Sequence, residues 1–230
     1  MPRPLTLAAL TLPLGLAAAS PAHAQETLDV GVLRDTDIEV VQKLLYPKTD
    51  ALELGGAVGW MPFDTYTTTP MLSLRVAKHF SENLGVEGEL SGGYGLKSYS
   101  YKQLEGPAYG IRPDAYRYLG GAFVGVQWSP IYAKMNWRGD QIFHHDVYTI
   151  AGLAGSYETA LMPDRTAALS PGVGLGLGLR IFMQNGDALR VQIRDDVMMQ
   201  YRDKTADAQG WFVKQNVSLT VGYSKLKRSN

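Results

Sequence analysis

The sequence contains no cysteine. Disulfides, lipid attachment at an N-terminal cysteine, thiolate catalysis and zinc–sulfur sites are therefore excluded. The sequence also lacks an excess of charge of either sign, because 22 basic residues balance 22 acidic ones. A chain without net charge has no strong field to attract nucleic acid or an acidic surface, so we expect no nucleic-acid partner.

Long hydrophobic runs are absent except at the N-terminus. There, Arg3 precedes the apolar run Leu5–Ala19, and the small-x-small sequence Ala22-His23-Ala24 follows. This pattern is typical of a secretory signal peptide, and its length and flanks do not fit a membrane-spanning helix. We expect residues 1–24 to be cleaved and the mature protein to lie outside the cytoplasm.

From residue 51 onward, apolar residues alternate with small or polar ones, which is the period of a β-strand. We expect strands over 51–60, 72–80, 84–94, 118–128, 147–157, 172–182, 189–194 and 211–223. Tight turns at 81–83 and 184–187 join neighbouring strands into hairpins. Ser129-Pro130 is expected to end a strand, and residues 131–146 to be a bent entry into the next strand. The alternative, a separate ninth strand over 131–146, would give an odd count, whereas bacterial single-chain barrels have even counts.

The polar face of these strands favours a membrane barrel over a soluble one. Charged residues lie among glycines at mid-strand positions, where opposite charges can pair across a narrow lumen while glycine relieves crowding. We expect the lumen charge network to consist of Glu53, Arg75, Glu87, Glu89, Arg180, Arg190, Arg194, Asp196 and Lys214. The sequence thus predicts an all-β fold, an eight-stranded antiparallel transmembrane β-barrel over residues 51–224, with residues 225–230 as a C-terminal tail.

The two ends of this barrel are expected to differ. Tight turns near residues 81, 129 and 184 would face the periplasm, and longer loops around 61–70, 98–117, 157–170 and 202–210 the opposite side. Aromatic residues near the strand ends would form the two interfacial girdles. These are Tyr66, Tyr99, Tyr101, Tyr116, Tyr118, Trp128, Trp137, Tyr157, Tyr201 and Trp211.

Residues 25–50 form a polar leader in which apolar residues recur at helical spacing. The apolar positions are Ile38, Val41, Leu44 and Leu45. Asp35 or Thr36 would cap a short amphipathic helix there, and Pro47 would end it. We expect this helix on the periplasmic side, where it either braces the barrel mouth or packs on a neighbouring protein.

Five segments of the chain carry a resemblance to a known family. They are Asp37–Lys43, Glu53-Leu54, Tyr132–Lys134, Gly176–Phe182 and Arg194-Asp195. In these residues the chain resembles the outer-membrane β-barrel domain family known from myxobacteria and related deltaproteobacteria. The resemblance covers most of the mature chain and implies an outer-membrane barrel without established enzyme activity. Some such barrels are associated with gliding-motility or envelope complexes. The barrel-assembly signal usually ends on a C-terminal aromatic residue, whereas here Tyr223 is followed by Ser224–Asn230.

Two groups of residues have the residue types of a chemical site. His144-His145-Asp146 has metal-ligand chemistry, but adjacent strand residues point to opposite faces, so we expect a solvated connection and no metal. His79, Ser81 and Glu82 lie close in sequence and have the residue types of a hydrolytic site. Ser and Glu are also ordinary turn residues, so we expect no enzyme activity and no cofactor.

The function expected from the sequence is that of an anchor or interaction component of the cell envelope, with a closed, charge-filled lumen. Its expected partners are outer-membrane lipid, the barrel-assembly machinery and envelope proteins. A narrow channel for small solutes is the first alternative, and a lipid-modifying outer-membrane enzyme is the second. The sequence does not identify a partner or a solute.

Overall fold

A computed structural model of the chain describes residues 45–137, 141–162, 167–183, 186–205 and 208–228. These residues lie in the second of two compact units, Lys43–Asn230. Its strands are β1 (Ala51–Met61), β2 (Thr67–His79), β3 (Leu84–Gly93), β4 (Leu96–Lys97), β5 (Tyr116–Trp137), β6 (Gln141–Ala160), β7 (Ala168–Phe182), β8 (Asp187–Thr205) and β9 (Ala208–Arg228). The helix α1 (Tyr99–Glu105) follows β4.

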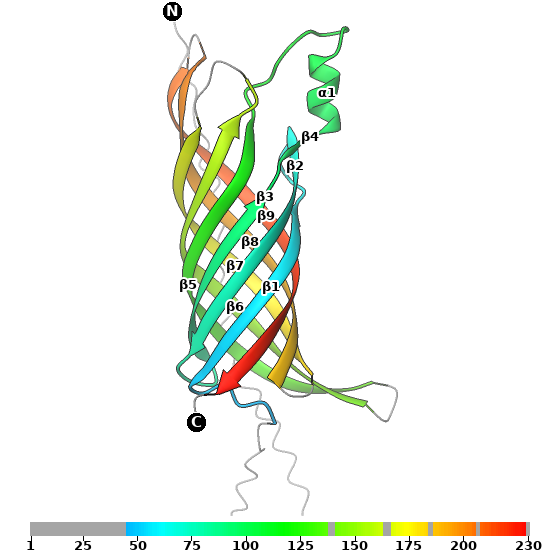
Figure 1. Cartoon of the computed structure of the whole chain (residues 1–230), viewed down its shortest axis with the longest axis vertical. Coiled ribbons are helices and arrows are strands. Elements are labelled where there is room, and N and C mark those ends of the chain that lie inside the picture. The colour runs from blue at the N-terminus through cyan, green and yellow to red at the C-terminus, as the bar shows by residue number, and fades with distance from the viewer. Residues whose placement is uncertain (1–44, 138–140, 163–166, 184–185, 206–207, 229–230) are drawn as a thin grey trace, which may run out of the picture. The chain divides into compact units, whose positions relative to one another are not determined.

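Eight of the strands close into a ring. Each pairs antiparallel with its neighbour in the order β1-β9-β8-β7-β6-β5-β3-β2, and β1 also pairs with β2 (Figure 1). The short β4 lies outside the ring and pairs only with Thr67 and Thr68 at the start of β2. The prediction of an eight-stranded antiparallel β-barrel is therefore confirmed.

The barrel has two ends, named here by their places in Figure 1. The lower end carries the turn between β2 and β3 and the segment 45–50, and the upper end carries α1. Ser98 caps α1, because its hydroxyl accepts a hydrogen bond from the backbone N–H of Tyr101. This helix was not predicted, since its seven residues are too few to show a helical period.

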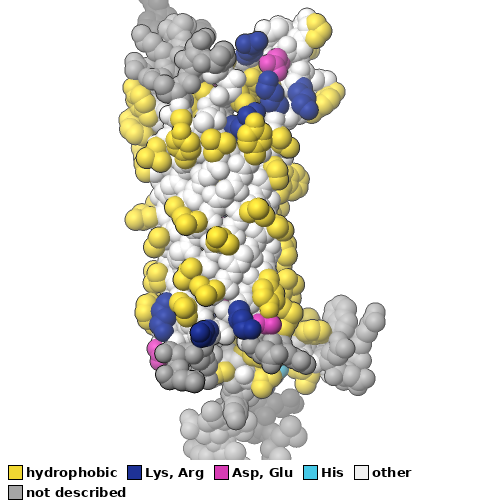
Figure 2. All heavy atoms as spheres, viewed as in Figure 1, with side chains coloured by type: hydrophobic (Ala, Val, Ile, Leu, Met, Phe, Trp, Pro, Cys, Tyr) yellow, Lys and Arg dark blue, Asp and Glu magenta, His cyan; other side chains and the backbone are white. Residues whose placement is uncertain are grey.

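The wall carries apolar side chains on its outer face and polar ones on its inner face. In β7, Val173, Leu175 and Leu177 are exposed, while Gly174 and Gly176 between them, and Arg180 further along the same face, are buried. The same alternation runs along every long strand, because successive side chains point to opposite sides of a sheet. Figure 2 shows apolar side chains along the visible wall and basic side chains gathered near its two ends.

Glycine makes room for large side chains inside the barrel. Tyr148 of β6 lies opposite Gly178 of β7, and a Cβ atom built at Gly178 would lie 2.2 Å from Cζ of the tyrosine ring. That distance is far below van der Waals contact, so no side chain fits there. The buried Tyr148 ring is therefore accommodated by the absence of a side chain on the neighbouring strand.

The prediction that Ser129-Pro130 ends a strand was wrong. β5 continues to Trp137, and the pairing with β6 shifts between Trp128 and Ile131, so that two residues of β5 oppose one of β6. Such a β-bulge tolerates proline, which has no N–H to give to the ladder. Residues 131–137 and 141–146 therefore belong to two long strands, β5 and β6, which leaves the count at eight.

The expected tail also differs from the structure. β9 runs to Arg228, and Lys225–Arg228 pair with β1 from Ala51 to Leu54. Closing the ring requires a partner for the whole length of β1, and this extends the last strand beyond Tyr223. Residues 225–228 are thus part of the barrel.

The expected leader helix lies largely outside the described residues. Leu45–Asp50 are described, and they form bends and turns before β1. In the part of the chain that the structure describes, no helix is long and apolar enough to span a membrane.

Candidate functional site: the charged interior of the barrel

All nine side chains predicted for the interior charge network lie on the inner face of the wall. They come from six strands: Glu53 (β1), Arg75 (β2), Glu87 and Glu89 (β3), Arg180 (β7), Arg190, Arg194 and Asp196 (β8), and Lys214 (β9). Eight are buried, and the Lys214 side chain is 13% exposed. Their ion pairs form three groups at different heights of the barrel.

The first group, the lower network, joins strands from opposite sides of the ring. Arg180 lies 2.9 Å from Glu53 and 2.9 Å from Asp146. Arg190 lies 3.1 Å from Glu53 and 2.6 Å from Glu87. Arg180 and Asp146 are register partners on the neighbouring strands β7 and β6. The pairs of Arg180 and Arg190 with Glu53, and of Arg190 with Glu87, join strands that are not neighbours in the ring, so these pairs cross the interior.

Tyr148 holds the two arginines of the lower network in place. Arg190 Nε donates to the Tyr148 hydroxyl at 3.1 Å, and this hydroxyl donates to Gln192 Oε1 at 2.9 Å. The ring centroid lies 5.2 Å from the Arg180 guanidinium carbon and 4.7 Å from that of Arg190. Both distances are within the range of cation–π attraction. The tyrosine thus adds an attractive contact to each of the two arginines, beside their ion pairs.

The segment 45–50, which we call the strap, adds a further cation at the lower end. Lys48 is buried and its Nζ donates to Asp146 Oδ2. Burial lowers the pKa of the Lys48 ammonium, and the Asp146 carboxylate opposes this shift. The ring of Tyr46 stacks on Phe182 with centroids 5.4 Å apart. The strap therefore packs its polar and its aromatic side chains against the lower end of the barrel.

Glu82, in the turn between β2 and β3, holds the strap from outside. Its carboxylate accepts hydrogen bonds from the backbone N–H groups of Lys48 and Thr49 and from the Thr49 hydroxyl, at 2.9, 3.0 and 2.6 Å. Burial raises the pKa of Glu82, but these hydrogen bonds outweigh burial and leave the pKa below its ordinary value. The strap is thus fixed at both Lys48 and Thr49.

The second group, the middle network, lies above the first. Glu89 pairs with Arg75, and it lies 3.1 Å from Arg194. Arg194 also lies 2.9 Å from Asp196. Its guanidinium carbon lies 4.4 Å from the centroid of the Phe123 ring, so one of its faces is covered by an aromatic side chain.

The third group, the upper cluster, is built around Glu158. This carboxylate accepts hydrogen bonds from Lys214 at 2.7 Å, from Gln200 at 2.9 Å and from Asn216 at 3.1 Å. Lys214 also lies 3.4 Å from Asp64, which is partly exposed. A polar pocket of about 230 Å³ adjoins Lys214 and Asp64. Solvent therefore reaches the edge of this cluster.

The interior is balanced in charge and filled. Besides His79, the three groups contain six basic and six acidic side chains: Lys48, Arg75, Arg180, Arg190, Arg194, Lys214, Glu53, Glu87, Glu89, Asp146, Glu158 and Asp196. Arg180 and Glu53 are 0% and 1% exposed, so no water-sized space adjoins them. An open water-filled pore would leave such side chains accessible, whereas the lower network leaves no water-sized space around these two.

Three members of the network were missed in the sequence. Lys48 lies in the leader, which has no strand period, and Glu158 lies in a segment expected to be a loop. Asp146 was expected in a solvated connection, which was wrong, because it is 0% exposed and binds both Lys48 and Arg180. Extending the alternation of β6 backward from Tyr148 would have placed Asp146 on the inner face.

The candidate metal and catalytic residues do not converge. His144 packs against Tyr46 on one face of β6, with ring centroids 5.6 Å apart, and His145 lies on the other face. Among the described residues, no group of three or more histidine or acidic side chains is arranged to hold a metal ion.

The possible hydrolytic group is also dispersed. His79 Nε2 lies 2.9 Å from Glu53 in the interior. Ser81 Oγ accepts hydrogen bonds from the backbone of its own turn, and Glu82 binds the strap. These three residues therefore serve three separate structural contacts.

Comparisons with known proteins agree with the fold. No protein-family model matches the sequence, and no curated protein does. The outer membrane protein OprG from Pseudomonas aeruginosa matches with a TM-score of 0.50 and 11% identity, over 80% of this chain and 98% of that chain. Neisserial surface protein A matches with a TM-score of 0.45 and 9% identity, over 76% and 95%. The N-terminal β-barrel domain of Pseudomonas aeruginosa OprF matches with a TM-score of 0.45 and 11% identity, over 76% and 98%. At these identities the likeness concerns the fold alone, a small antiparallel β-barrel.

Proposed function

We propose that this protein is an outer-membrane barrel with a closed interior that acts as an anchor or interaction component of the cell envelope. The proposal rests on the exposed apolar side chains of the outer wall. Leu74, Leu153, Leu169 and Val213 are 70%, 72%, 75% and 72% exposed, and they come from four different strands. Exposed apolar surface that encircles a barrel is costly in water and is the usual lipid-facing surface of a membrane barrel.

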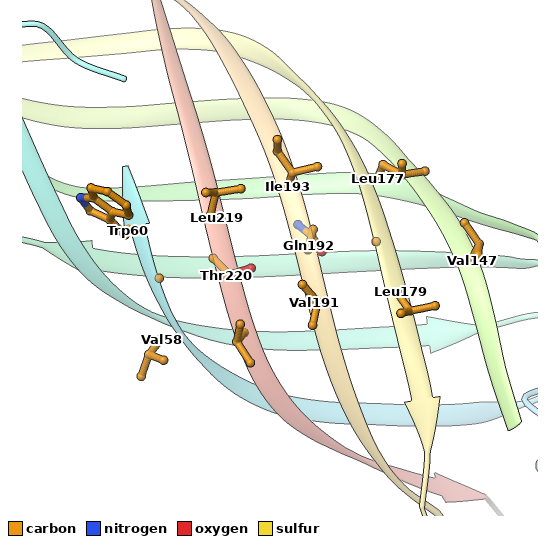
Figure 3. A pocket seen from close by; sticks show the side chains of 13 residues that line it. Val58, Trp60, Val147, Leu177, Leu179, Val191, Gln192, Ile193, Leu219 and Thr220 are labelled. Carbon is orange, nitrogen blue, oxygen red and sulfur yellow. The ribbon is translucent and has the colours of Figure 1, made fainter. Parts of the chain in front are cut away.

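The outer wall also has a shallow apolar hollow of the kind that lipid chains fill. In Figure 3, Trp60, Leu219, Ile193 and Leu177 project from four neighbouring strands around a shallow hollow of about 790 Å³. Its lining is almost wholly apolar, and no charged side chain takes part. Hydrocarbon chains pack into such a hollow without leaving a polar group unpaired.

Aromatic residues support a membrane-spanning orientation. Tyr157, Tyr201 and Trp211 are exposed at the upper ends of their strands, and Trp128 and Tyr223 are exposed towards the lower end. Amphipathic rings of this kind prefer the two membrane–water interfaces. We assign the lower end to the periplasm because it carries the short turn between β2 and β3 and the N-terminal strap.

The filled interior favours an anchor over a channel. A solute would have to displace Arg180, Arg190 and Glu53, whose ion pairs cross the lumen. We expect partner proteins to bind at the two ends of the barrel instead. These ends carry the α1 segment above and the extension of β5 and β6 below (Figure 1). The predicted signal peptide and the resemblance to the myxobacterial barrel family agree with this proposal.

Cell fractionation tests the location. The full chain, expressed in a Gram-negative host, is expected in the outer-membrane fraction and should migrate faster on gels before heating than after it. Recovery of folded protein from the soluble periplasmic fraction would overturn the proposal. A charged substitution on the wall, Leu177→Arg, serves as the matched variant and should reduce insertion, because an arginine near the bilayer midplane costs roughly 2–4 kcal/mol.

A further inference from the structure

One acidic residue faces outward in the middle of the wall. Asp195 lies halfway along β8, between the outward-facing Ile193 and Val197, and its register partners are Leu175 and Val217. Apart from Asp195, all outward-facing side chains of β8 from Leu189 to Met199 are apolar. The next residue, Asp196, faces inward and pairs with Arg194, so only Asp196 belongs to the interior network.

Asp195 has an unpaired carboxylate oxygen. Its Oδ1 is buried against neighbouring atoms and accepts no hydrogen bond from the residues that the structure describes. An unpaired buried acceptor is destabilising, and an unpaired carboxylate is more so. Acyl chains offer no donor, and lipid headgroups lie at the membrane surfaces. Lipid contact alone therefore leaves this group unsatisfied.

Asp195 also lies at the edge of a hollow in the wall. The hollow has a volume of about 850 Å³ and crosses β3, β5, β6, β7 and β8. Small residues, Gly125, Ala151, Gly152 and Gly174, contribute to its lining. The lining is mostly apolar, and Asp195 is the one charged residue among those that line it.

We propose that this hollow binds a membrane-spanning segment of a partner protein that carries a lysine or arginine near the middle of the membrane. The aliphatic stem of such a side chain would lie along the apolar lining, and its charged head would pair with Asp195. Charge complementarity selects this occupant over lipid and over a second copy of this face, whose own carboxylate would repel Asp195. The inference rests on the proposed outer-membrane location.

The test uses purified full-length protein in phosphatidylcholine vesicles. Its probe is a synthetic Leu/Ala transmembrane helix with one central lysine, compared with the same helix carrying norleucine. Energy transfer between labelled barrel and labelled helix measures association. The lysine helix should bind the wild-type barrel about fivefold more tightly, the ratio expected for a polar contact of about 1 kcal/mol within a membrane.

Three variants locate the effect. Asp195→Leu removes the carboxylate, and Ala151→Trp fills the hollow while leaving Asp195 in place, so both should abolish the preference for lysine. Ala122→Trp makes the same change at an outward-facing alanine of β5 that does not line the hollow, and it should retain the preference. A preference that survives Asp195→Leu would overturn the inference, and one that survives Ala151→Trp would overturn the role of the hollow.

The two proposals fail in distinguishable ways. Equal binding of both helices to a wild-type barrel that is inserted and protected from protease would overturn the Asp195 site and leave the outer-membrane proposal intact. A barrel that does not insert into the vesicles at all would overturn the outer-membrane proposal first.

Discussion

The lower network and the upper cluster both hold paired charges, but they differ in how their carboxylates are satisfied. In the lower network, Glu53 is shared by Arg180 and Arg190 and also lies beside His79, in a space that water does not reach. In the upper cluster, Glu158 has one cation, Lys214, and otherwise accepts from neutral side chains. Because Arg190 serves both Glu53 and Glu87, its removal disturbs two buried carboxylates at once, whereas the upper cluster lies beside a polar pocket that solvent reaches.

The largest effect is expected from Arg190→Ala. The substitution leaves Glu53 and Glu87 short of a partner inside the lower network, which should lower the free energy of unfolding by roughly 3–5 kcal/mol. Urea unfolding of vesicle-inserted protein, followed by tryptophan fluorescence, measures this loss. Arg202→Ala is the matched control near the upper cluster, where the arginine side chain is 21% exposed and lies 3.6 Å from Asp114. Arg202→Ala should lower the free energy of unfolding by under about 1 kcal/mol. Equal losses for Arg190→Ala and Arg202→Ala would show that the two regions do not differ in this respect.

A smaller effect is expected from crowding the lower network. Gly178→Ala places a methyl group 2.2 Å from the Tyr148 ring and should cost about 1–3 kcal/mol. Gly155→Ala in β6 is the control, because nothing lies within 4 Å of the added carbon there. The same unfolding experiment compares the two. If both variants matched the wild type, the lower interior would be looser than its contacts indicate.

The upper cluster is expected to tolerate loss of charge. Glu158→Gln keeps the shape and most acceptors and should cost about 1 kcal/mol. Glu53→Gln, the same exchange in the lower network, should cost more, because Arg180 and Arg190 both lose their charged partner. A larger loss at Glu158 than at Glu53 would reverse the comparison.

The smallest effect concerns the strap and depends on pH. Because the folded pKa of Glu82 is lowered, its contribution to stability is present above the unfolded value of about 4.3 and is lost as the pH falls through the lower folded value. The difference in stability between wild type and Glu82→Gln should therefore shrink as the pH falls below about 4. Unfolding measured at several pH values checks this. A difference that grows on acidification would show that Glu82 does not bind the strap as a carboxylate.

Which side chains of the wall face inward was largely predictable. Odd and even positions of a strand point to opposite faces, so this parity of the residue number sets the direction of each side chain. Arg180, Arg190 and Arg194 each fall one residue away from an apolar position, so a single assignment of the apolar face orients all of them. The same parity separates Asp195 from Asp196. Eight strands followed from counting these alternating segments.

The partners inside the lumen were not predictable from parity. Arg190 lies 137 residues from Glu53, and only the closure of the ring brings them together. The bulge at Ser129-Pro130 looked like a turn, since proline often ends a strand. Lys48 lies in a segment without strand period, so its burial depends on contacts with Asp146 and Glu82 that only the folded chain supplies.

Ion conductance of the purified wild-type protein in planar lipid bilayers shows whether the interior of the barrel is closed. Protein whose insertion is verified by protease protection should give no steady conductance steps, because the Arg180, Arg190 and Glu53 ion pairs fill the lumen. Regular, long-lived steps from the folded barrel would contradict a closed interior and favour a narrow channel instead.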